Sequence, residues 1–264
     1  MNNTIFVKRY RMAEAIGDIN QTEVFRYSGY KLSSGEPDPQ LMAIYEQVVS
    51  EAMPVLEAKV CFRRVPLEWE GGMPMLPFSS ESRLLAECLK GSDEVVIFAA
   101  TIGMGIDRLI ARNQRLSPTK ALFFQALGAE RIEAVCNHFC RELRQEAAES
   151  GKITSPRYSP GYGDLPLEKQ TELFRLLDCS RQIGLSLNES LLMTPAKSVT
   201  AIFGIRPGGM LVADDSKPGE EKTSSGASLS AQNEKRMFDG DVCDEQEHKC
   251  AYCSKTDCDY RTGK

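Results

Sequence analysis

The chain has 264 residues, of which 42% are hydrophobic and 26% charged, and its formal net charge is −5. This size and apolar content are enough to bury one substantial core. The negative charge argues against nucleic acid or an anionic membrane as the main partner, because both bind clustered Lys and Arg. The N-terminal sequence has no signal-peptide pattern, and no run approaches 18 apolar residues. We therefore expect a cytoplasmic protein whose nine cysteines are free thiols or metal ligands.

The first half of the chain is predicted to contain helices and strands in mixed order. Residues 39–63 have apolar side chains at helical spacing and are predicted as one helix. Residues 66–77 are interrupted by glycines and prolines, which favours short strands and turns. The run EVVIFAAT at 94–101 predicts a buried strand. The following TIGMGIDR has only two glycines, so it favours a tight turn into a helix over a nucleotide-binding loop.

The second half is predicted to be mainly helical. A long helix is expected over 117–150, with serine as its N-cap and proline in its first turn. Another helix is expected over 164–183, followed by a buried strand at 198–205. Strands and helices do not alternate regularly, so we predict an α+β fold for residues 1–206, with a bent antiparallel or mixed sheet and flanking helices.

The C-terminal part of the sequence has a different composition. Residues 207–236 are rich in Gly, Pro, Ser and charge, and we predict a flexible linker because such a segment cannot offset its ordering entropy. The segment 237–264 contains four cysteines in the spacing C-x6-C-x2-C-x4-C, namely Cys243, Cys250, Cys253 and Cys258. Thiols this dense in a polar segment have no apolar face to fill, which predicts a zinc or iron–sulfur site. Redox-exposed free thiols are the alternative.

One carboxylate in the long helix lies on a face of small residues. At 100° per residue, Glu133 lies among Ala126, Ala129, Cys136 and Cys140. Such short side chains cannot shield a charge. Glu133 is therefore either a boundary residue that reaches solvent or a ligand-binding carboxylate that meets a donor in a cavity.

The loop RYSPGYGD at 157–164 contains a second candidate set. Pro160 and Gly161 fit a type II turn, in which glycine supplies the positive φ. Arg157 can hold a carboxylate through two parallel N–H bonds, and Tyr162 can cover an aromatic ring while its hydroxyl stays in water. The alternative is an ordinary loop that leads into a helix.

The segment RYSPGYGDLPLEKQTELFRLLDCSRQIGLSLNESLLMTPAKSVTAIFGI resembles the activation domain of cobalamin-dependent methionine synthase. That family has an R-x-x-x-G-Y loop before a helix, and then an I/T-G-x-x-L-x-E-S-x-x-M-x-P-x-x-S-V run that leads into a strand. The matching residues are Arg157, Gly161, Tyr162, Gly184, Leu187, Glu189, Ser190, Met193, Pro195, Ser198 and Val199. Glu133 and Ala134 also align with a Glu-Ala pair on the family's long helix.

The sequence departs from the family at two positions near the loop. The family continues P-A-C-P-D-H after its Gly-Tyr, whereas this chain has Gly163, Asp164, Leu165 and Pro166. The family also has an acidic residue where this chain has Gly151.

The resemblance implies a shallow binding site for S-adenosylmethionine (SAM). By position, Arg157 would hold the SAM carboxylate, and Glu133 would engage polar groups of SAM directly or through water. Main-chain groups around Ser159 and Gly161 would bind the amino-acid end or the adenine. Tyr162 would border the site. No catalytic acid or base is expected, because SAM supplies the reactive methyl group.

The implied function is reductive methylation of cob(II)alamin on a partner, with an electron donor such as a flavodoxin or ferredoxin. The chain would be a stand-alone reactivation subunit for a cobalamin-dependent methionine synthase that lacks its own activation domain, and so an accessory to a methyltransferase of methionine biosynthesis. Two other functions remain open. One is an iron–sulfur electron-transfer protein whose active part is the cysteine segment, and the other is a corrinoid-protein docking module that does not use SAM.

Overall fold

The computed structural model describes residues 4–30 and 38–208. All of them except Gly208 belong to a compact unit that ends at Pro207. Of the linker predicted over 207–236, Pro207 is the last residue of a strand, and the part from residue 209 lies outside the described residues, as does the cysteine segment with Cys243, Cys250, Cys253 and Cys258. Within the described ranges, no helix is long and apolar enough to cross a membrane.

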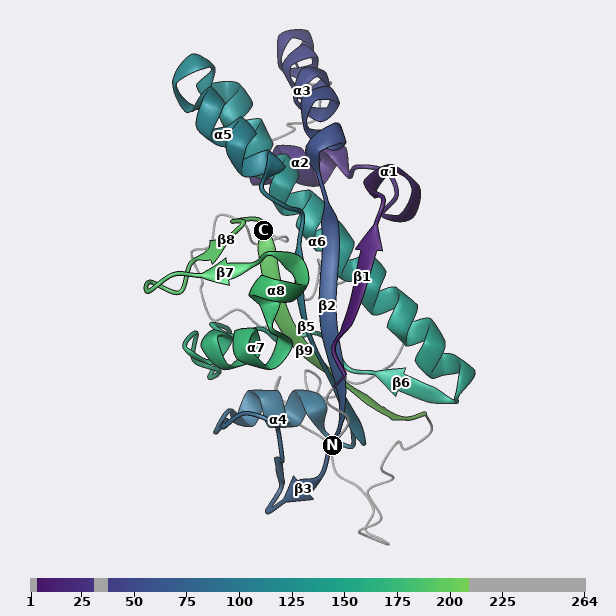
Figure 1. Ribbon diagram of the computed structural model, residues 1–264. Helices are drawn as coiled ribbons and strands as arrows, with labels where there is room; N and C mark the ends of the chain where they lie inside the picture. The colour runs from purple at the N-terminus through teal and green to yellow at the C-terminus, as the bar shows by residue number, and fades with distance from the viewer. Residues whose placement is uncertain (1–3, 31–37, 209–264) are drawn as a thin grey trace, which may run out of the picture. The chain divides into compact units, whose positions relative to one another are not determined.

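A five-stranded sheet in the order β1-β2-β5-β9-β6 forms the centre of this unit, and each pair of neighbouring strands is antiparallel (Figure 1). The strands are β1 (Phe6–Tyr10), β2 (Ala58–Pro66), β5 (Glu94–Thr101), β6 (Lys152–Thr154) and β9 (Ser198–Pro207). Two small hairpins pair β3 (Trp69–Glu70) with β4 (Met73–Pro74), and β7 (Ser186–Leu187) with β8 (Met193–Thr194). The predicted α+β class with an antiparallel sheet is confirmed.

Helices cover both faces of the sheet, as Figure 1 shows. On one face, α6 (Pro118–Glu149) lies along the strands, and α2 (Gln21–Tyr27), α3 (Pro39–Ala52) and α5 (Gly105–Leu116) pack on α6. Residues of these four helices and of α1 (Met12–Ala15) share one core. The other face is packed by α4 (Arg83–Leu89), α7 (Lys169–Leu177) and α8 (Cys179–Ile183). A 3₁₀ turn at Met53–Val55 joins α3 to the segment before β2.

Strand β5 is buried on both sides because its side chains alternate between the two helical layers. The residues that face the α6 layer are Val96, Phe98 and Ala100. The residues that face the α4, α7 and α8 layer are Val95, Ile97 and Ala99. The same alternation holds in β9, where Phe203 and Ile202 belong to opposite cores. This double burial explains why both strands are continuous apolar runs in the sequence.

Two predicted helices differ from the observed elements. The helix predicted over 39–63 is wrong in its second part: α3 ends at Ala52, and residues 58–66 form β2. Pairing with β1 on one side and β5 on the other determines the strand, so tertiary contacts override the local helical spacing. The helix predicted over 164–183 begins only at Lys169 and is divided by Asp178, whose φ of 47° is a left-handed conformation that aspartate tolerates.

The long helix α6 matches its prediction closely. Pro118 occupies the first turn, but Ser117 makes no side-chain cap hydrogen bond, contrary to the expectation. A buried pair on this helix fixes the N-terminal segment: the guanidinium of Arg131 donates to the carbonyls of Gly17 and Asp18 at 2.9 and 2.8 Å. Glu130 bonds Arg131 and accepts the N–H of Asn20 at 3.1 Å. These contacts satisfy both buried charges and hold the turn before α2 against α6.

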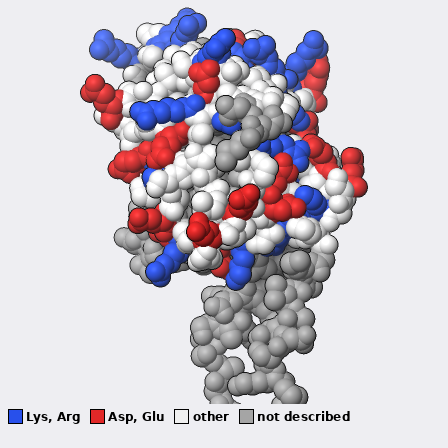
Figure 2. Space-filling view, turned by 60° about the horizontal axis from the view of Figure 1, so that its bottom comes forward, with Lys and Arg blue, Asp and Glu red and all other residues white. Residues whose placement is uncertain are grey.

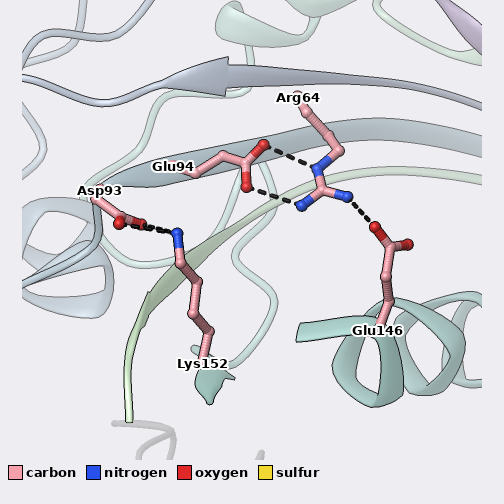
Figure 3. A network of polar contacts seen from close by, with 5 residues as sticks. All are labelled: Arg64, Asp93, Glu94, Glu146 and Lys152. Carbon is pink, nitrogen blue, oxygen red and sulfur yellow. Dashed lines mark hydrogen bonds and ion pairs between the residues drawn. The ribbon is translucent and has the colours of Figure 1, made fainter. Parts of the chain in front are cut away.

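Ion pairs at one end of the sheet connect β2, β5, β6 and α6 (Figure 3). Arg64 on β2 donates two N–H bonds to Glu94 on β5, at 2.8 and 2.9 Å, and a third to Glu146 on α6. Lys152 on β6 pairs with Asp93 at 2.9 Å. On the face shown in Figure 2, acidic and basic side chains are mixed. A mixed face lacks the clustered positive charge that nucleic acid binds.

The turn between β5 and α5 depends on glycine. Gly103 has a φ of +80°, and a Cβ on Gly105 would lie 2.2 Å from the carbonyl oxygen of Val55. The tight turn expected for TIGMGIDR is confirmed, and its second glycine is explained by the close approach of the chain before β2.

We predict that Gly105→Ala lowers the free energy of unfolding by roughly 1–3 kcal/mol, because backbone oxygen cannot move away as a flexible side chain can. Gly128→Ala on α6 is the matched control. There the new Cβ would meet Cγ of Lys197 at 3.0 Å, and that side chain can shift. The control is expected to remain within about 1 kcal/mol of the wild type. Urea unfolding followed by circular dichroism measures both variants, and equal stability of the two would contradict the argument.

Candidate functional site

The site candidate begins where the chain leaves β6 and returns to the edge of β9. Tyr158 pairs with Ile202 on β9 through two backbone bonds of 2.8 Å, which fixes the main chain at this point. Neighbouring side chains in an extended segment point to opposite faces. Tyr158 packs with the α4, α7 and α8 core, so Arg157 extends toward α6 on the other face.

Arg157 contacts two side chains of α6 through one nitrogen. Its Nη2 donates to Oε2 of Glu133 and to Oδ1 of Asn137, each at 2.9 Å. The Arg157 side chain is 8% exposed and that of Glu133 26%. Glu133 thus meets a donor and also reaches solvent, so it has a feature of each of the two alternatives. The arrangement is a half-buried arginine–carboxylate pair at the edge of a sheet, suited to a small ligand with its own carboxylate and amine.

Tyr27 on α2 lies close to this pair. Burial, and then the negative charge of Glu133, raise the pKa of Tyr27. Its ring also lies under the guanidinium of Arg26, 4.4 Å from the ring centroid. Tyr27 and Asn137 are two residues near the site that the sequence did not predict. Neither belongs to a sequence motif. They come close to Arg157 only when α2 and the segment after β6 pack against α6.

The predicted turn after Arg157 is confirmed. The N–H of Tyr162 donates to the carbonyl of Ser159 at 3.2 Å, and Gly161 has a φ of +90°. The Gly161 N–H donates to the carbonyl of Leu165 at 2.9 Å. The resemblance implies that main-chain groups around Ser159 and Gly161 bind the ligand. Here the Ser159 carbonyl and the Gly161 N–H make hydrogen bonds within the loop. Tyr162 is 63% exposed, at the rim rather than inside the pair formed by Arg157 and Glu133.

Two of the residues that depart from the family pattern, Gly163 and Asp164, fix this loop in place. Asp164 accepts bonds from the Ser82 hydroxyl and from the N–H groups of Arg83, at 2.8 Å, and Leu84, at 3.2 Å. It thereby caps the first turn of α4 together with the N-cap Ser82. Gly163 is required beside it, since a Cβ there would lie 2.2 Å from the hydroxyl oxygen of Tyr158.

An open hollow of about 570 Å³ lies elsewhere on the unit, along the turn between β5 and α5. Lys59, Arg108 and Arg112 line it, and none of the predicted site residues does. The hollow is therefore separate from the pair formed by Arg157 and Glu133. Among the described residues, no group of three or more His, Cys, Asp or Glu could hold a metal ion.

The five-stranded antiparallel sheet with a long helix on one face is the fold that the sequence resemblance implied, and this fold brings Arg157 and Glu133 together at the sheet edge. Residues 82–209 match the family model of the vitamin B12 dependent methionine synthase activation domain. The recognition made from the sequence is confirmed by this match.

A solved structure supports the same fold. The crystal structure of the MetH reactivation domain bound to AdoHcy matches with a TM-score of 0.59 and 16% sequence identity. The match covers 82% of this chain and 80% of that chain. The comparison with curated proteins finds no match. At this identity the structural likeness establishes the fold, and it places no ligand in this chain.

We predict that Asp164 stabilises the protein at neutral pH and not in acid. Desolvation opposes its ionisation, but the bonds from Ser82, Leu84 and Arg83 hold the pKa of Asp164 below its usual value. A carboxyl whose pKa is lower in the folded state contributes stability above its unfolded pKa of about 3.9, and this contribution is lost as the pH falls through the folded pKa.

Asp164→Asn should therefore lower the free energy of unfolding at pH 7 by less than about 1 kcal/mol, since the group is exposed. The difference from the wild type should persist down to about pH 5 and shrink as the pH falls below about 4. Glu81→Gln, which removes a negative charge beside the same helix, is the control and should have a smaller effect. Urea titrations across this range make the measurement, and a difference independent of pH would refute the capping role.

Proposed function

We propose that the described unit binds SAM and serves in the reactivation of a cobalamin-dependent methionine synthase. The observation that carries the proposal is the contact between Arg157 and Glu133. These two residues are far apart in the sequence, both match the family pattern, and the fold brings them together. The related reactivation domain is bound to AdoHcy, which has the same amino-acid end as SAM.

Each residue of the pair would contact one charge of the ligand's amino-acid end. The guanidinium of Arg157 would hold the carboxylate, because its planar N–H groups fit two oxygens. The carboxylate of Glu133 would attract the ammonium group. Burial of the Arg157 side chain strengthens such contacts by limiting water. The exposed Tyr162 would border the ligand, with main-chain groups near Ser159 and Gly161 beside it.

The role of the protein in the reaction would be to orient the methyl donor and shield it from water. The chemistry lies in the ligands: the sulfonium of SAM makes its methyl group electrophilic, and the partner's cob(II)alamin, reduced by one electron from a flavodoxin or ferredoxin, would take that methyl group and leave AdoHcy. The pair at the sheet edge is half-buried, so a bound donor can be presented outward to a second protein. Supplied as a separate chain, the unit would act in trans on a methionine synthase without its own activation domain.

We predict that the wild type binds SAM and that Arg157→Ala weakens binding by about 10- to 100-fold, the usual effect of removing a charged hydrogen bond. Glu133→Gln keeps an acceptor for Arg157 and should weaken binding less. Isothermal titration calorimetry measures the affinities, with circular dichroism as the test that each variant is folded. Absence of heat at millimolar SAM with folded wild-type protein would overturn the proposed function.

A test of activity follows from the same proposal. The protein is added to a methionine synthase deprived of its activation domain, with oxidised cobalamin, SAM and a reduced flavodoxin. Recovery of methylcobalamin, followed by its absorption spectrum, is expected with the wild type and reduced with Arg157→Ala. Recovery that needs no SAM would favour the docking module instead.

The metal site in the cysteine segment is proposed from the sequence alone, because these residues lie outside the described ranges. We propose that Cys243, Cys250, Cys253 and Cys258 bind zinc or an iron–sulfur cluster. Metal analysis after anaerobic purification is expected to find zinc or iron in the wild type and less in Cys253→Ser. One zinc and no iron would exclude a cluster in that preparation, and absence of both metals would leave free thiols.

A further inference from the structure

We propose that Asn137 is a positioning residue that fixes the guanidinium of Arg157 for the carboxylate of SAM. The inference rests on the proposed function and assigns a role to a residue outside the sequence motifs. Asn137 lies one helical turn after Glu133 on α6, so the two side chains project from the same face of the helix. Their oxygens lie at the same distance, 2.9 Å, from Nη2 of Arg157.

Two acceptors restrain a guanidinium more than one does. Nη2 carries two hydrogens in the plane of the group. With only one acceptor, the guanidinium could still rotate about the line between Nη2 and the acceptor oxygen. The second acceptor removes this rotation and fixes the guanidinium plane. Because Arg157 is only 8% exposed, water competes little for these hydrogens. When the guanidinium plane is already fixed, bidentate binding of a carboxylate costs less conformational entropy.

The amide at position 137 also determines the charge of the site. Glu133 carries one negative charge, which balances the positive charge of Arg157, and Asn137 adds an acceptor without a second negative charge. A carboxylate at this position would preserve the geometry but give the cluster a net charge of −1. That charge would repel the carboxylate of SAM, and it would not repel a ligand that lacks one.

The competing explanation is that Asn137 only helps to hold the segment after β6 against α6. The anchoring of this segment does not depend on Asn137 alone, because Tyr158 forms two backbone bonds with Ile202. A structural role would affect all ligands of the site alike. A positioning role for the carboxylate would affect only ligands that have one.

The experiment compares SAM with decarboxylated SAM, which keeps the adenosine, the sulfonium and the amine. Asn137→Ala and Asn137→Asp are made in the full chain, and Gln125→Ala, exposed on the same helix, is the control. Calorimetry measures both ligands for each variant. Both variants are expected to weaken SAM binding about tenfold or more. Both should leave the affinity for decarboxylated SAM within about twofold of the wild type, or improve it in Asn137→Asp.

The outcomes separate the two proposals. If the folded wild type binds no SAM, both fail together. If the wild type binds SAM and Asn137→Asp binds it equally well, the positioning role fails and the proposed function stands. Equal losses for SAM and decarboxylated SAM would assign Asn137 a structural role only. If Asn137→Ala does not fold, the near-isosteric Asn137→Asp still distinguishes the positioning role from a structural one.

Discussion

Helix α6 is longer than the sheet on which it packs, and this mismatch shapes the rest of the unit. Its 32 residues rise about 1.5 Å each, or about 48 Å in all, whereas the ten residues of β9 span about 33 Å. The part of α6 that extends beyond the strands must bury its apolar side chains against something else. Helices α2, α3 and α5 supply that surface, with Phe25, Tyr45 and Ile106 in the same core as Phe123 and Phe124. The helices at this end are thus a consequence of the length of α6.

Two of the arginine–carboxylate pairs that involve α6 have different surroundings. Arg131 and Glu130 are almost fully buried, and their remaining hydrogen-bonding groups are satisfied by main-chain groups of the turn before α2. Such a pair holds the chain together. Arg157 and Glu133 lie at the sheet edge, with Glu133 about a quarter exposed. A pair that solvent can reach can also exchange one partner for a ligand. The carboxylates of the two pairs lie within one turn of α6, so what distinguishes the pairs is their exposure to solvent.

The sequence was most informative where local pattern and tertiary structure agree. Strands β5 and β9 could be predicted because burial on both faces makes them continuous apolar runs, and α6 because its apolar face persists for 32 residues. Strand β2 could not, because its residues also fit helical spacing and its partners lie far away in the chain. Glu133 was singled out from the helix face of small residues and Arg157 from its loop, and the resemblance to a family then gave both a ligand-binding role. Asn137 was missed because an asparagine on a helix has no distinctive signal until the arginine packs on it.

The enclosure of Gly163 limits how this protein can be recombined with its relatives. The hydroxyl of Tyr158 and the side chain of Leu84 occupy the space that a larger residue at 163 would need. A relative's loop with Pro-Ala in place of Gly163-Asp164 would both collide there and leave the first turn of α4 without its carboxylate. A chimaera would therefore have to exchange the loop and the start of α4 as one block, although more than 70 residues separate them in the chain. The contacts in space, and not the order in the sequence, therefore decide which segments can be exchanged.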